Sequence, residues 1–262
     1  MPAIGIIGGS GVYRMPPVEL IREEAVDTPY GAPSDTYKIL KISGIEAVFL
    51  ARHGSGHTIP PHKVNYRANI WGFKSLGVNR LLSMGAVGGL NTLLWPGDIV
   101  VADQIIDMTT GRTSTFYDKD EVYHVDFSEP FCPELRAAFI EAAAAVELPV
   151  LTRGTYVCTN GPRFETRAEI RYYSIIGADV VGMTAMPEAV LAREAEICYG
   201  TIATVTNFAA GISTGKLTTT EVIETINKSS INLNALLLRA ISLIKAQRHC
   251  PCKDALKDAK LG

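Results

Sequence analysis

Short apolar runs rich in Val and Ile alternate with amphipathic stretches along most of the chain, and this alternation constrains the fold most. Seven runs predict strands, at Ile4–Ile7, Ala47–Leu50, Arg80–Ser83, Ile99–Val101, Thr155–Cys158, Asp179–Val181 and Thr201–Val205. Helical spacing predicts helices at Tyr66–Leu76, Pro133–Val146, Thr166–Ile176, Pro187–Tyr199 and Thr220–Ala246. Because strands alternate with helices and the runs are mostly apolar on both faces, the sequence predicts an α/β fold, with a mostly parallel sheet covered on both sides.

Composition and charge limit the partners that such a fold binds. The 25 Lys and Arg residues nearly balance the 27 Asp and Glu residues, which leaves a net charge of −2. A chain without excess positive charge has no broad field to attract nucleic acid or an anionic membrane, so we expect neither partner. No apolar run approaches the roughly 20 residues of a membrane-spanning helix. Any phosphate-bearing ligand must therefore be held by a local site.

The chain shows no internal division, and its cysteines indicate a compartment. No linker, repeat or low-complexity tract interrupts residues 1–249, so we expect one domain there, followed by a polar, Lys-rich and loosely attached tail over residues 250–262. The five cysteines are odd in number, Cys132, Cys158 and Cys198 lie far apart in apolar surroundings, and no secretory segment follows Met1. These features predict a cytoplasmic protein.

Two glycine-rich segments match nucleotide-binding motifs only in part. The first predicted strand runs into Gly8–Gly11, where backbone N–H groups can approach an anion. A dinucleotide fingerprint requires a glycine where Arg14 stands and a helix where Pro16–Pro17 stands, so we do not expect a Rossmann site. Gly211–Leu217 is one residue short of a P-loop and lacks the Ser or Thr that binds magnesium, so we do not expect ATP chemistry.

A cationic cluster follows the predicted strand at Ala47–Leu50. Arg52 and His53 stand next to glycines, and a guanidinium is a planar, two-pronged donor that suits phosphate or carboxylate. His57 and His62 follow in the same loop; the alternative for the whole cluster is a surface loop whose side chains bond to the backbone. Histidines without an HExxH pattern or flanking carboxylates do not predict a metal site.

Four further loops lie where strands are expected to end, at Met84–Asn91, Asn160–Arg167, Gly182–Glu188 and Thr206–Gly211. Open α/β sheets bind their ligands at this edge. The second loop combines the aromatic ring of Phe164 with the carboxylate of Glu165, a pair that can pack against a flat heterocycle and form hydrogen bonds with it. The sequence therefore predicts one site built from several loops.

Seven separated motifs occur in a recognisable order, at Ile7–Gly11, Arg52–Gly54, His57–His62, Asn65–Arg67, Gly85–Gly88, Gly161–Thr166 and Gly182–Glu188. This ordered set resembles the trimeric nucleoside phosphorylases, and most of all their 5′-methylthioadenosine phosphorylase branch. The resemblance implies a single domain with a twisted mixed central sheet flanked by helices, assembled as a homotrimer or as a homohexamer of two trimers. It also implies phosphorolysis, in which inorganic phosphate displaces a purine from a nucleoside and gives a sugar 1-phosphate.

The resemblance also assigns roles by position. The implied phosphate-binding residues are Ser10, Arg52, His53, Ala86 through its backbone, and Thr184. Met183 would lie against the ribose. Family members commonly have Thr or Asn where this chain has Gly85, so backbone or water must replace that contact. Phosphate is itself the nucleophile, so we expect no cofactor and no catalytic triad; the protein has to hold phosphate and aim it at C1′.

The base site departs from the methylthioadenosine branch. Asn207 and Ala209 stand where that branch typically has an Asp-x-Asp pair, and Glu165 stands where it typically has Ser and 6-oxopurine phosphorylases have Glu. Glu165 would accept from purine N1–H, Asn207 would donate to O6 or N7 as charge builds there, and Phe164 would pack on the base. We therefore interpret Glu165 and Asn207 as catalytic residues for 6-oxopurine nucleosides. The alternative is that Glu165 is only an exposed neighbour of a helix N-cap and that Asn207 is only a turn residue.

Other assignments are less specific. Thr219 is placed near the ribose 5′ group, where its methyl and hydroxyl suit a 5′-methylthio or a 5′-hydroxyl group equally, so inosine, guanosine and 5′-methylthioinosine all remain open. His57 is a further substrate-binding candidate. His124, in the long loop at 108–130, is the best candidate for a residue lent to a neighbouring subunit's site. Cys250 and Cys252 resemble the C-terminal Cys-x-Cys of some heat-stable relatives, and are either a redox-active disulfide or, more simply, two tail thiols; metal binding is the weakest of the alternatives.

Three rival functions stay open at this stage. Methylthioadenosine phosphorolysis is the function that the overall resemblance suggests if the loop at Thr206–Gly211 is ignored. A hydrolytic nucleosidase would act without phosphate and would need a carboxylate that activates water. A non-catalytic nucleotide-binding module is disfavoured, because the motifs for the phosphate and for the base both look complete.

Overall fold

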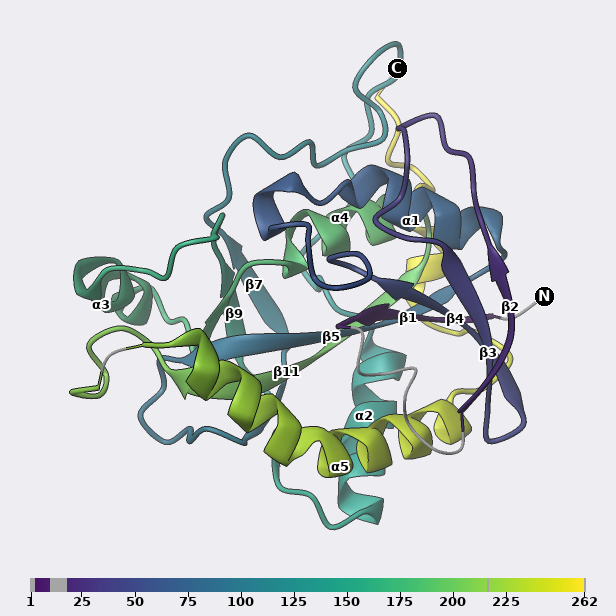
Figure 1. Cartoon of the computed structure of the whole chain (residues 1–262). Helices are drawn as coiled ribbons and strands as arrows, with labels where there is room; N and C mark the ends of the chain where they lie inside the picture. Colours follow the sequence, from purple (N-terminus) through teal and green to yellow (C-terminus); the bar gives the residue numbers. More distant parts are fainter. Residues whose placement is uncertain (1–2, 10–17, 216, 262) are drawn as a thin grey trace.

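A computed structural model describes residues 3–9, 18–215 and 217–261. Figure 1 shows a twisted central sheet with helices packed on both faces. The strands are β1 (Ile4–Gly8), β2 (Val18–Glu24), β3 (Tyr37–Ile42), β4 (Ile45–Ala51), β5 (Arg80–Gly89), β6 (Ile99–Val101), β7 (Gln104–Asp107), β8 (Val150–Leu151), β9 (Thr155–Cys158), β10 (Val180–Gly182) and β11 (Cys198–Phe208). The helices are α1 (Tyr66–Ser75), α2 (Pro133–Ala145), α3 (Arg167–Ile175), α4 (Ala185–Glu194) and α5 (Thr219–Leu243), with 3-10 helices η2 (Pro61–Lys63) and η3 (Pro251–Asp254).

The pairing of the strands makes the sheet mixed. The order is β2-β3-β4-β1-β5-β10-β9-β7, and β11 also pairs with β5 and carries β6 and then β8. Strands β4, β1, β5 and β11 are parallel at the centre, whereas the pairs β2–β3, β3–β4, β5–β10 and β6–β11 are antiparallel. The α/β fold with a mixed central sheet is thus confirmed.

The elements differ from the sequence prediction in two ways. Strands β2, β3, β7 and β8 were not predicted, because β2 is charged and mostly exposed and β8 has only two residues. The helix predicted over Pro187–Tyr199 is wrong at its end, since α4 stops at Glu194 and β11 begins at Cys198. Glu196 adopts a left-handed conformation with φ of +57° directly after the helix, which ends it and turns the chain into the strand.

Side chains on successive strand positions face two separate cores. Ile7 and Leu81 pack on the side of α1 and α4, while Ile6 and Leu82 pack on the side of α2 and α5. Figure 1 shows these helix pairs on opposite faces of the sheet. Because both faces are covered, the sheet can bind a ligand only at its edges, among the loops that follow the strands.

Strands β5 and β11 bring together the segments predicted as site loops at Met84–Asn91 and Thr206–Gly211. The prediction that the strands end before these segments is wrong, since β5 continues to Gly89 and β11 to Phe208. They run parallel from Arg80 opposite Cys198 to Gly89 opposite Phe208, with a register shift between Val205 and Asn207. Strand β10 lies antiparallel on the other side of β5. The chain that leaves β10 therefore runs back along β5.

The C-terminal segment is packed on the body, so the prediction of a loosely attached tail over residues 250–262 is wrong. Cys250 and Cys252 are buried, the segment folds into η3, and Lys260 forms a β-bridge with Tyr123. Lys260 Nζ also lies 2.6 Å from Glu121 Oε1. The polar composition of the segment led to the wrong prediction, because its two buried thiols behave as small apolar side chains. Within the described part of the chain, no helix has the length and apolar character needed to cross a membrane.

Candidate active site

Arg52, one of the residues predicted to bind phosphate, directly follows β4 and contacts the end of β1 and the middle of β5. The backbone N–H of Arg52, directly after β4, donates to the carbonyl of Gly8 at the end of β1 (3.1 Å). The Nη1 of Arg52 donates to the carbonyl of Met84 in β5 (3.0 Å). Parallel pairing of these strands sets this arrangement, because it aligns their carboxyl ends at one edge of the sheet.

The loop after β10 completes this corner of the sheet. A Cβ at Gly85 would lie 3.8 Å from Thr184 Oγ1, so the threonine hydroxyl faces the strand where family members commonly have a larger residue. Thr184 occupies the N-cap position of α4 but does not cap it through its side chain. Ala86, the next residue of β5, is exposed. Ser10 lies outside the described residues.

The guanidinium of Arg52 binds the carboxylate of Glu188, whereas the sequence predicted that it binds phosphate. It is only 2% exposed and forms a two-pronged ion pair with Glu188, with Nε–Oε1 and Nη2–Oε2 distances of 2.8 and 2.9 Å. Ser83 Oγ accepts a third bond from Nη2 (2.7 Å). Tyr199 Oη donates to Glu188 Oε2 (2.8 Å). The two-pronged edge of Arg52 therefore faces a buried carboxylate rather than an open anion site.

His53 is held as a neutral imidazole beside Arg52. Its Nδ1 lies 2.8 Å from the carbonyl of Ile59, and because a carbonyl only accepts, Nδ1 carries the proton. Burial, together with the positive charge of Arg52, lowers the pKa of His53 to about 4. The ring stacks on that of His57 at a centroid distance of 4.3 Å. At neutral pH, Nε2 of His53 thus offers a lone pair.

Glu165 lies half-buried in the loop between β9 and α3. Its Oε1 accepts from Thr159 Oγ1 (2.7 Å), which leaves Oε2 as an acceptor. Burial is the main cause that raises the pKa of Glu165 above its usual range. The next residue, Thr166, starts α3 with a capping box to Glu169, and this fixes the backbone that carries Glu165. A donor from a ligand would relieve the cost of burying this carboxylate.

Asn207 lies 5% exposed at the end of β11, with its amide orientation fixed by its partners. One amide group lies 2.9 Å from the carbonyl of Phe208, which only accepts, so that group is Nδ2. Oδ1 accepts from Thr206 Oγ1 (2.9 Å). A Cβ at Gly88 would lie 3.4 Å from Nδ2, so the glycine leaves space beside the amide. Asn207 therefore keeps one Nδ2–H for a further acceptor.

Three other residues predicted for the base or ribose site lie in the segments that follow β9, β10 and β11. Phe164 is 37% exposed, next to Glu165 in the chain. Ala209 is buried, with its backbone N–H bonded to the carbonyl of Gly89. Met183 packs over Gly161, where any Cβ would collide with its sulfur. Because positions 207 and 209 hold Asn and Ala, neither position supplies a carboxylate to this side of the site.

One residue that connects the loops of the candidate site, Arg112, was not singled out from the sequence. Arg112 Nη1 donates to the carbonyls of Met183 (2.9 Å) and Met186 (2.5 Å), and Nη2 donates to the carbonyl of Asn160 (2.9 Å). The guanidinium also lies 5.2 Å from the ring centroid of Tyr66. One side chain thus ties together the loops after β9 and β10. The sequence predicted a role in a neighbouring subunit's site for His124 in the long loop at 108–130, but no motif marked Arg112 in that loop.

Two predicted substrate residues, Thr219 and His124, make no contact with this site among the interactions described, and a third, His57, reaches it through His53. Thr219 is the exposed first residue of α5. His57 is exposed and contacts the site through His53. His124 is exposed, and its backbone N–H donates to the carbonyl of Ala259 in the C-terminal segment (2.8 Å).

The protein family whose model the sequence matches agrees with the candidate active site described above. The model of the Phosphorylase superfamily matches residues 3–242. The chain belongs to this superfamily. It is a nucleoside phosphorylase and therefore an enzyme of the pentosyltransferase class.

Curated phosphorylases resemble the chain along almost its full length. The 6-oxopurine nucleoside phosphorylase of Pyrococcus furiosus is 57% identical, covering 99% of each chain. A probable S-methyl-5′-thioinosine phosphorylase of Thermodesulfovibrio yellowstonii is 51% identical, covering 98% of this chain and 96% of the relative. The S-methyl-5′-thioadenosine phosphorylase of Pyrococcus horikoshii is 49% identical, covering 98% of each.

Solved phosphorylases share the fold. A methylthioadenosine phosphorylase from an antarctic soil metagenomic library superimposes with a TM-score of 0.93 at 40% identity, covering 99% of this chain and 92% of the other. The methylthioadenosine phosphorylase of Schistosoma mansoni, in complex with adenine, gives a TM-score of 0.92 at 37% identity, covering 98% and 97%. The expected nucleoside phosphorylase architecture is confirmed.

Proposed function

We propose that this phosphorylase acts on 6-oxopurine nucleosides and transfers their ribosyl group to inorganic phosphate, releasing hypoxanthine or guanine. The observation that carries the proposal is that the loop after β9 supplies a half-buried acceptor, Glu165, and the end of β11 supplies an amide donor, Asn207. A 6-oxopurine presents N1–H as a donor and O6 as an acceptor, and a 6-aminopurine presents the reverse pattern.

Glu165 supplies the acceptor in this proposal. Its free Oε2 accepts from N1–H, and from the 2-amino group when the base is guanine. Because burial raises the pKa of this carboxyl, a donor from the base stabilises its ionised form. A 6-aminopurine has only a lone pair at N1, so it would leave the buried carboxylate without that partner.

Asn207 supplies the donor. Thr206 and Phe208 hold the amide so that the remaining Nδ2–H is available for O6 or N7 of the base. Negative charge develops on the purine as the bond to C1′ breaks, so this hydrogen bond is stronger in the transition state than in the ground state. Asn207 therefore acts on the leaving base, while Phe164 packs against the ring.

Phosphate is the nucleophile and the only other substrate, so the reaction needs no cofactor. Thr184, the backbone at Ala86 and His53 surround its place in the proposal, with Ser10 as a predicted further ligand. Since Glu188 neutralises Arg52, phosphate is held mainly by hydrogen bonds rather than by a free guanidinium. The lone pair on Nε2 of His53 accepts from the protonated oxygen of HPO₄²⁻.

The names of two curated relatives support a preference for 6-oxopurine bases, but they do not decide which group the ribose carries at its 5′ position. Two curated relatives bear the names 6-oxopurine nucleoside phosphorylase and probable S-methyl-5′-thioinosine phosphorylase, and both names imply a 6-oxopurine base. Inosine, guanosine and 5′-methylthioinosine are thus the candidate substrates. We also propose a cytoplasmic homotrimer or homohexamer in which His124 contributes to a neighbouring site.

The test is a panel of inosine, guanosine, 5′-methylthioinosine, adenosine and methylthioadenosine, each with and without phosphate. We expect turnover of the three 6-oxopurine nucleosides only when phosphate is present. Turnover without phosphate would mean a hydrolase. Preference for the adenine nucleosides would mean a methylthioadenosine phosphorylase and would refute the roles given to Glu165 and Asn207.

A further inference from the structure

The carboxylate of Glu165 has one side-chain hydrogen-bond partner among the described residues, and that partner is Thr159. Thr159 Oγ1 lies 2.7 Å from Glu165 Oε1 and 3.5 Å from the carbonyl oxygen of Gly182. A hydroxyl carries a single hydrogen, so Thr159 can donate to only one of these two oxygens at a time. The direction of the bond between Thr159 and Glu165 therefore depends on whether the carboxyl is protonated.

The fold fixes the place of the Thr159 hydroxyl. Thr159 directly follows β9, and its backbone N–H donates to the carbonyl of Gly182 (2.8 Å), which extends the pairing of β9 with β10. Arg112 Nη2 donates to the carbonyl of Thr159 (3.3 Å). Thr159 is buried, whereas Glu165 is half-buried in the loop that follows. The hydroxyl thus has a fixed position from which it can orient the carboxylate.

The two proton states of Glu165 use this hydroxyl differently. An ionised carboxylate only accepts, so Thr159 donates to Oε1 over the short distance of 2.7 Å. A protonated carboxyl that donates to Thr159 Oγ1 turns the hydroxyl hydrogen toward the carbonyl of Gly182, 3.5 Å away. Hydrogen bonds to an ionised acceptor are shorter and stronger than those between neutral groups, so this arrangement favours the ionised form.

The charged groups around Glu165 leave Thr159 as its main stabilising partner. Burial raises the pKa of Glu165, and the hydrogen bond from Thr159 is the largest effect that lowers this pKa. Glu169 raises the pKa and Arg163 lowers it, and these two side chains bind each other (2.7 Å), so their effects oppose. Burial also raises the pKa of Tyr173 on α3, which is therefore neutral where the carboxyl titrates.

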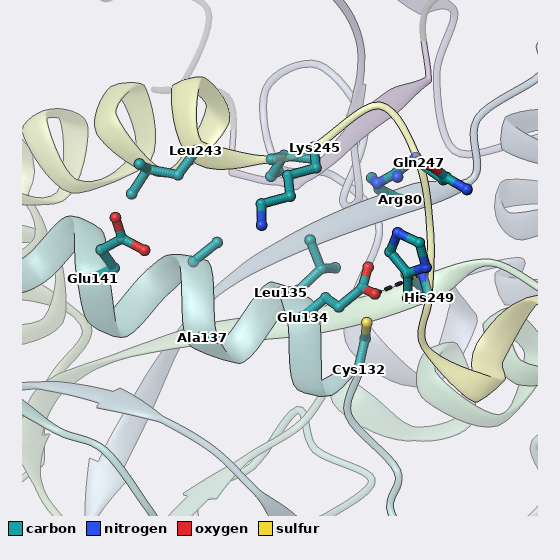
Figure 2. Close-up of a pocket in the computed structure, with 13 residues that line it drawn as sticks. Arg80, Cys132, Glu134, Leu135, Ala137, Glu141, Leu243, Lys245, Gln247 and His249 are labelled. Carbon is teal, nitrogen blue, oxygen red and sulfur yellow. Dashed lines mark hydrogen bonds between the residues drawn. The ribbon is translucent and has the colours of Figure 1, made fainter.

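A second group of charged side chains lies too far away to act on Glu165. Figure 2 shows Arg80 and Lys245 beside a pocket between α2 and the chain after α5. Arg80 is the first residue of β5, whereas β10, which ends at Gly182, pairs with the last two residues of that strand. A strand rises about 3.3 Å per residue, so this pocket lies about 20 Å or more from Gly182, beyond the Debye length of about 10 Å.

We propose that Thr159 is a positioning residue for base recognition, which holds Glu165 ionised and leaves Oε2 to face the base. The inference rests on the proposed role of Glu165 as the acceptor for N1–H. An ionised carboxylate only accepts, so it suits a 6-oxopurine, whereas a protonated carboxyl can donate to the lone pair at N1 of a 6-aminopurine. Thr159 therefore disfavours adenine nucleosides without contacting the base.

The test is the pH dependence of kcat/KM for inosine, which falls on the acid side when Glu165 becomes protonated. Thr159→Val keeps the shape of the side chain but removes the hydroxyl, so the midpoint of this acid limb should lie about one pH unit higher than in the wild type. Between the two midpoints, the preference of the variant for inosine over adenosine should fall several-fold. Thr159→Ser keeps the hydroxyl and should restore the wild-type midpoint and preference.

Thr155→Val is the matched control. Thr155 is the first residue of β9, and its side chain makes none of the hydrogen bonds described for this part of the chain, so this variant should keep the wild-type profile. The Tm of each variant shows that it is folded. An acid limb in Thr159→Val that coincides with that of the wild type would overturn the inference, as would a change that Thr159→Ser shares.

A double variant separates this inference from the proposed function. Loss of the acid limb in Glu165→Ala supports the role of Glu165, and in that background Thr159→Val should lower kcat/KM no further, because Thr159 acts only through Glu165. A further loss would mean that Thr159 supports the structure alone, and would overturn the inference while the proposed function stands. A wild-type acid limb in Glu165→Ala would refute the role of Glu165 itself, and the inference with it.

Discussion

At the scale of single residues, base selection depends on one amide orientation. Asn207 presents a donor because Thr206 and Phe208 occupy its other positions. Asn207→Asp replaces the donor by an acceptor, so the ratio of kcat/KM for adenosine to that for inosine should rise by at least about tenfold, or about 1.4 kcal/mol. Steady-state kinetics on both nucleosides measure this. An unchanged ratio would mean that Asn207 does not contact the base.

Glu165 should set the acid limb of the pH profile. Because burial raises its pKa, the carboxylate is protonated at a higher pH than an exposed glutamate. The value of kcat/KM for inosine should therefore fall on the acid side, beginning above pH 4.5, the usual pKa of the group. Glu165→Gln should reduce kcat/KM and abolish this limb. An identical acid limb in the variant would assign the titration to another group.

His53 should link stability to pH with a definite sign. Its pKa falls from 6.5 in the unfolded chain to about 4 in the folded protein, so the unfolded chain binds more protons between these values. This contribution to stability is complete above pH 6.5 and is lost as the pH falls toward 4. His53→Asn, which does not titrate, should show a smaller loss of Tm over this range. Equal losses in both proteins would contradict the lowered pKa.

At the scale of elements, the loop at 108–130 positions the substrate loops through Arg112. Arg112→Met keeps the apolar stem but removes the donors to the carbonyls of Met183, Met186 and Asn160. We expect a lower Tm, by about 2–4 °C for each kcal/mol lost, and a lower kcat/KM. Arg153→Met is the control, since the Arg153 side chain is 85% exposed. Equal Tm values for the two variants would contradict the role of Arg112.

The element scale also shows what a sequence can predict. Runs apolar on both faces marked the central strands, because burial on two sides leaves a continuous pattern. Strand β2 was missed because it is charged and mostly exposed. Within the candidate site, the places of Glu165 before α3 and of Asn207 near the end of β11 followed from the order of the predicted elements, whereas the partner of Arg52 did not, since Glu188 lies 136 residues away. Burial of the C-terminal segment was not predicted, because Cys250 and Cys252 lie close to Cys132 and Cys198, which are distant from them in the sequence.

At the scale of the whole molecule, the exposed apolar residues are consistent with an assembly. Leu93, Trp95, Ile175 and Ile223 are each more than half exposed, and subunit contacts in the proposed oligomer would bury such side chains. His124 is exposed and makes only a backbone contact to the C-terminal segment among the interactions described. These features agree with the proposal that subunits share a site.

Subunit complementation tests that sharing. His124→Ala and Asn207→Ala should each lower activity strongly, the first by removing a residue from the neighbour's site. In co-assembled oligomers, about one quarter of the sites combine an intact Asn207 with an intact His124 from the adjacent chain. Activity should therefore rise well above the mean of the two parent variants. A mixture no more active than that mean would show that His124 serves no neighbouring site.

The central claim is that the site reads a 6-oxopurine base, and a competition experiment tests it most directly. Equimolar inosine and adenosine are incubated with the wild-type enzyme and phosphate, and hypoxanthine and adenine are quantified at low conversion. The product ratio equals the ratio of the two kcat/KM values. We predict at least about a hundredfold excess of hypoxanthine, since adenine leaves buried polar groups unpaired. Equal amounts of the two bases, or an excess of adenine, would contradict the account.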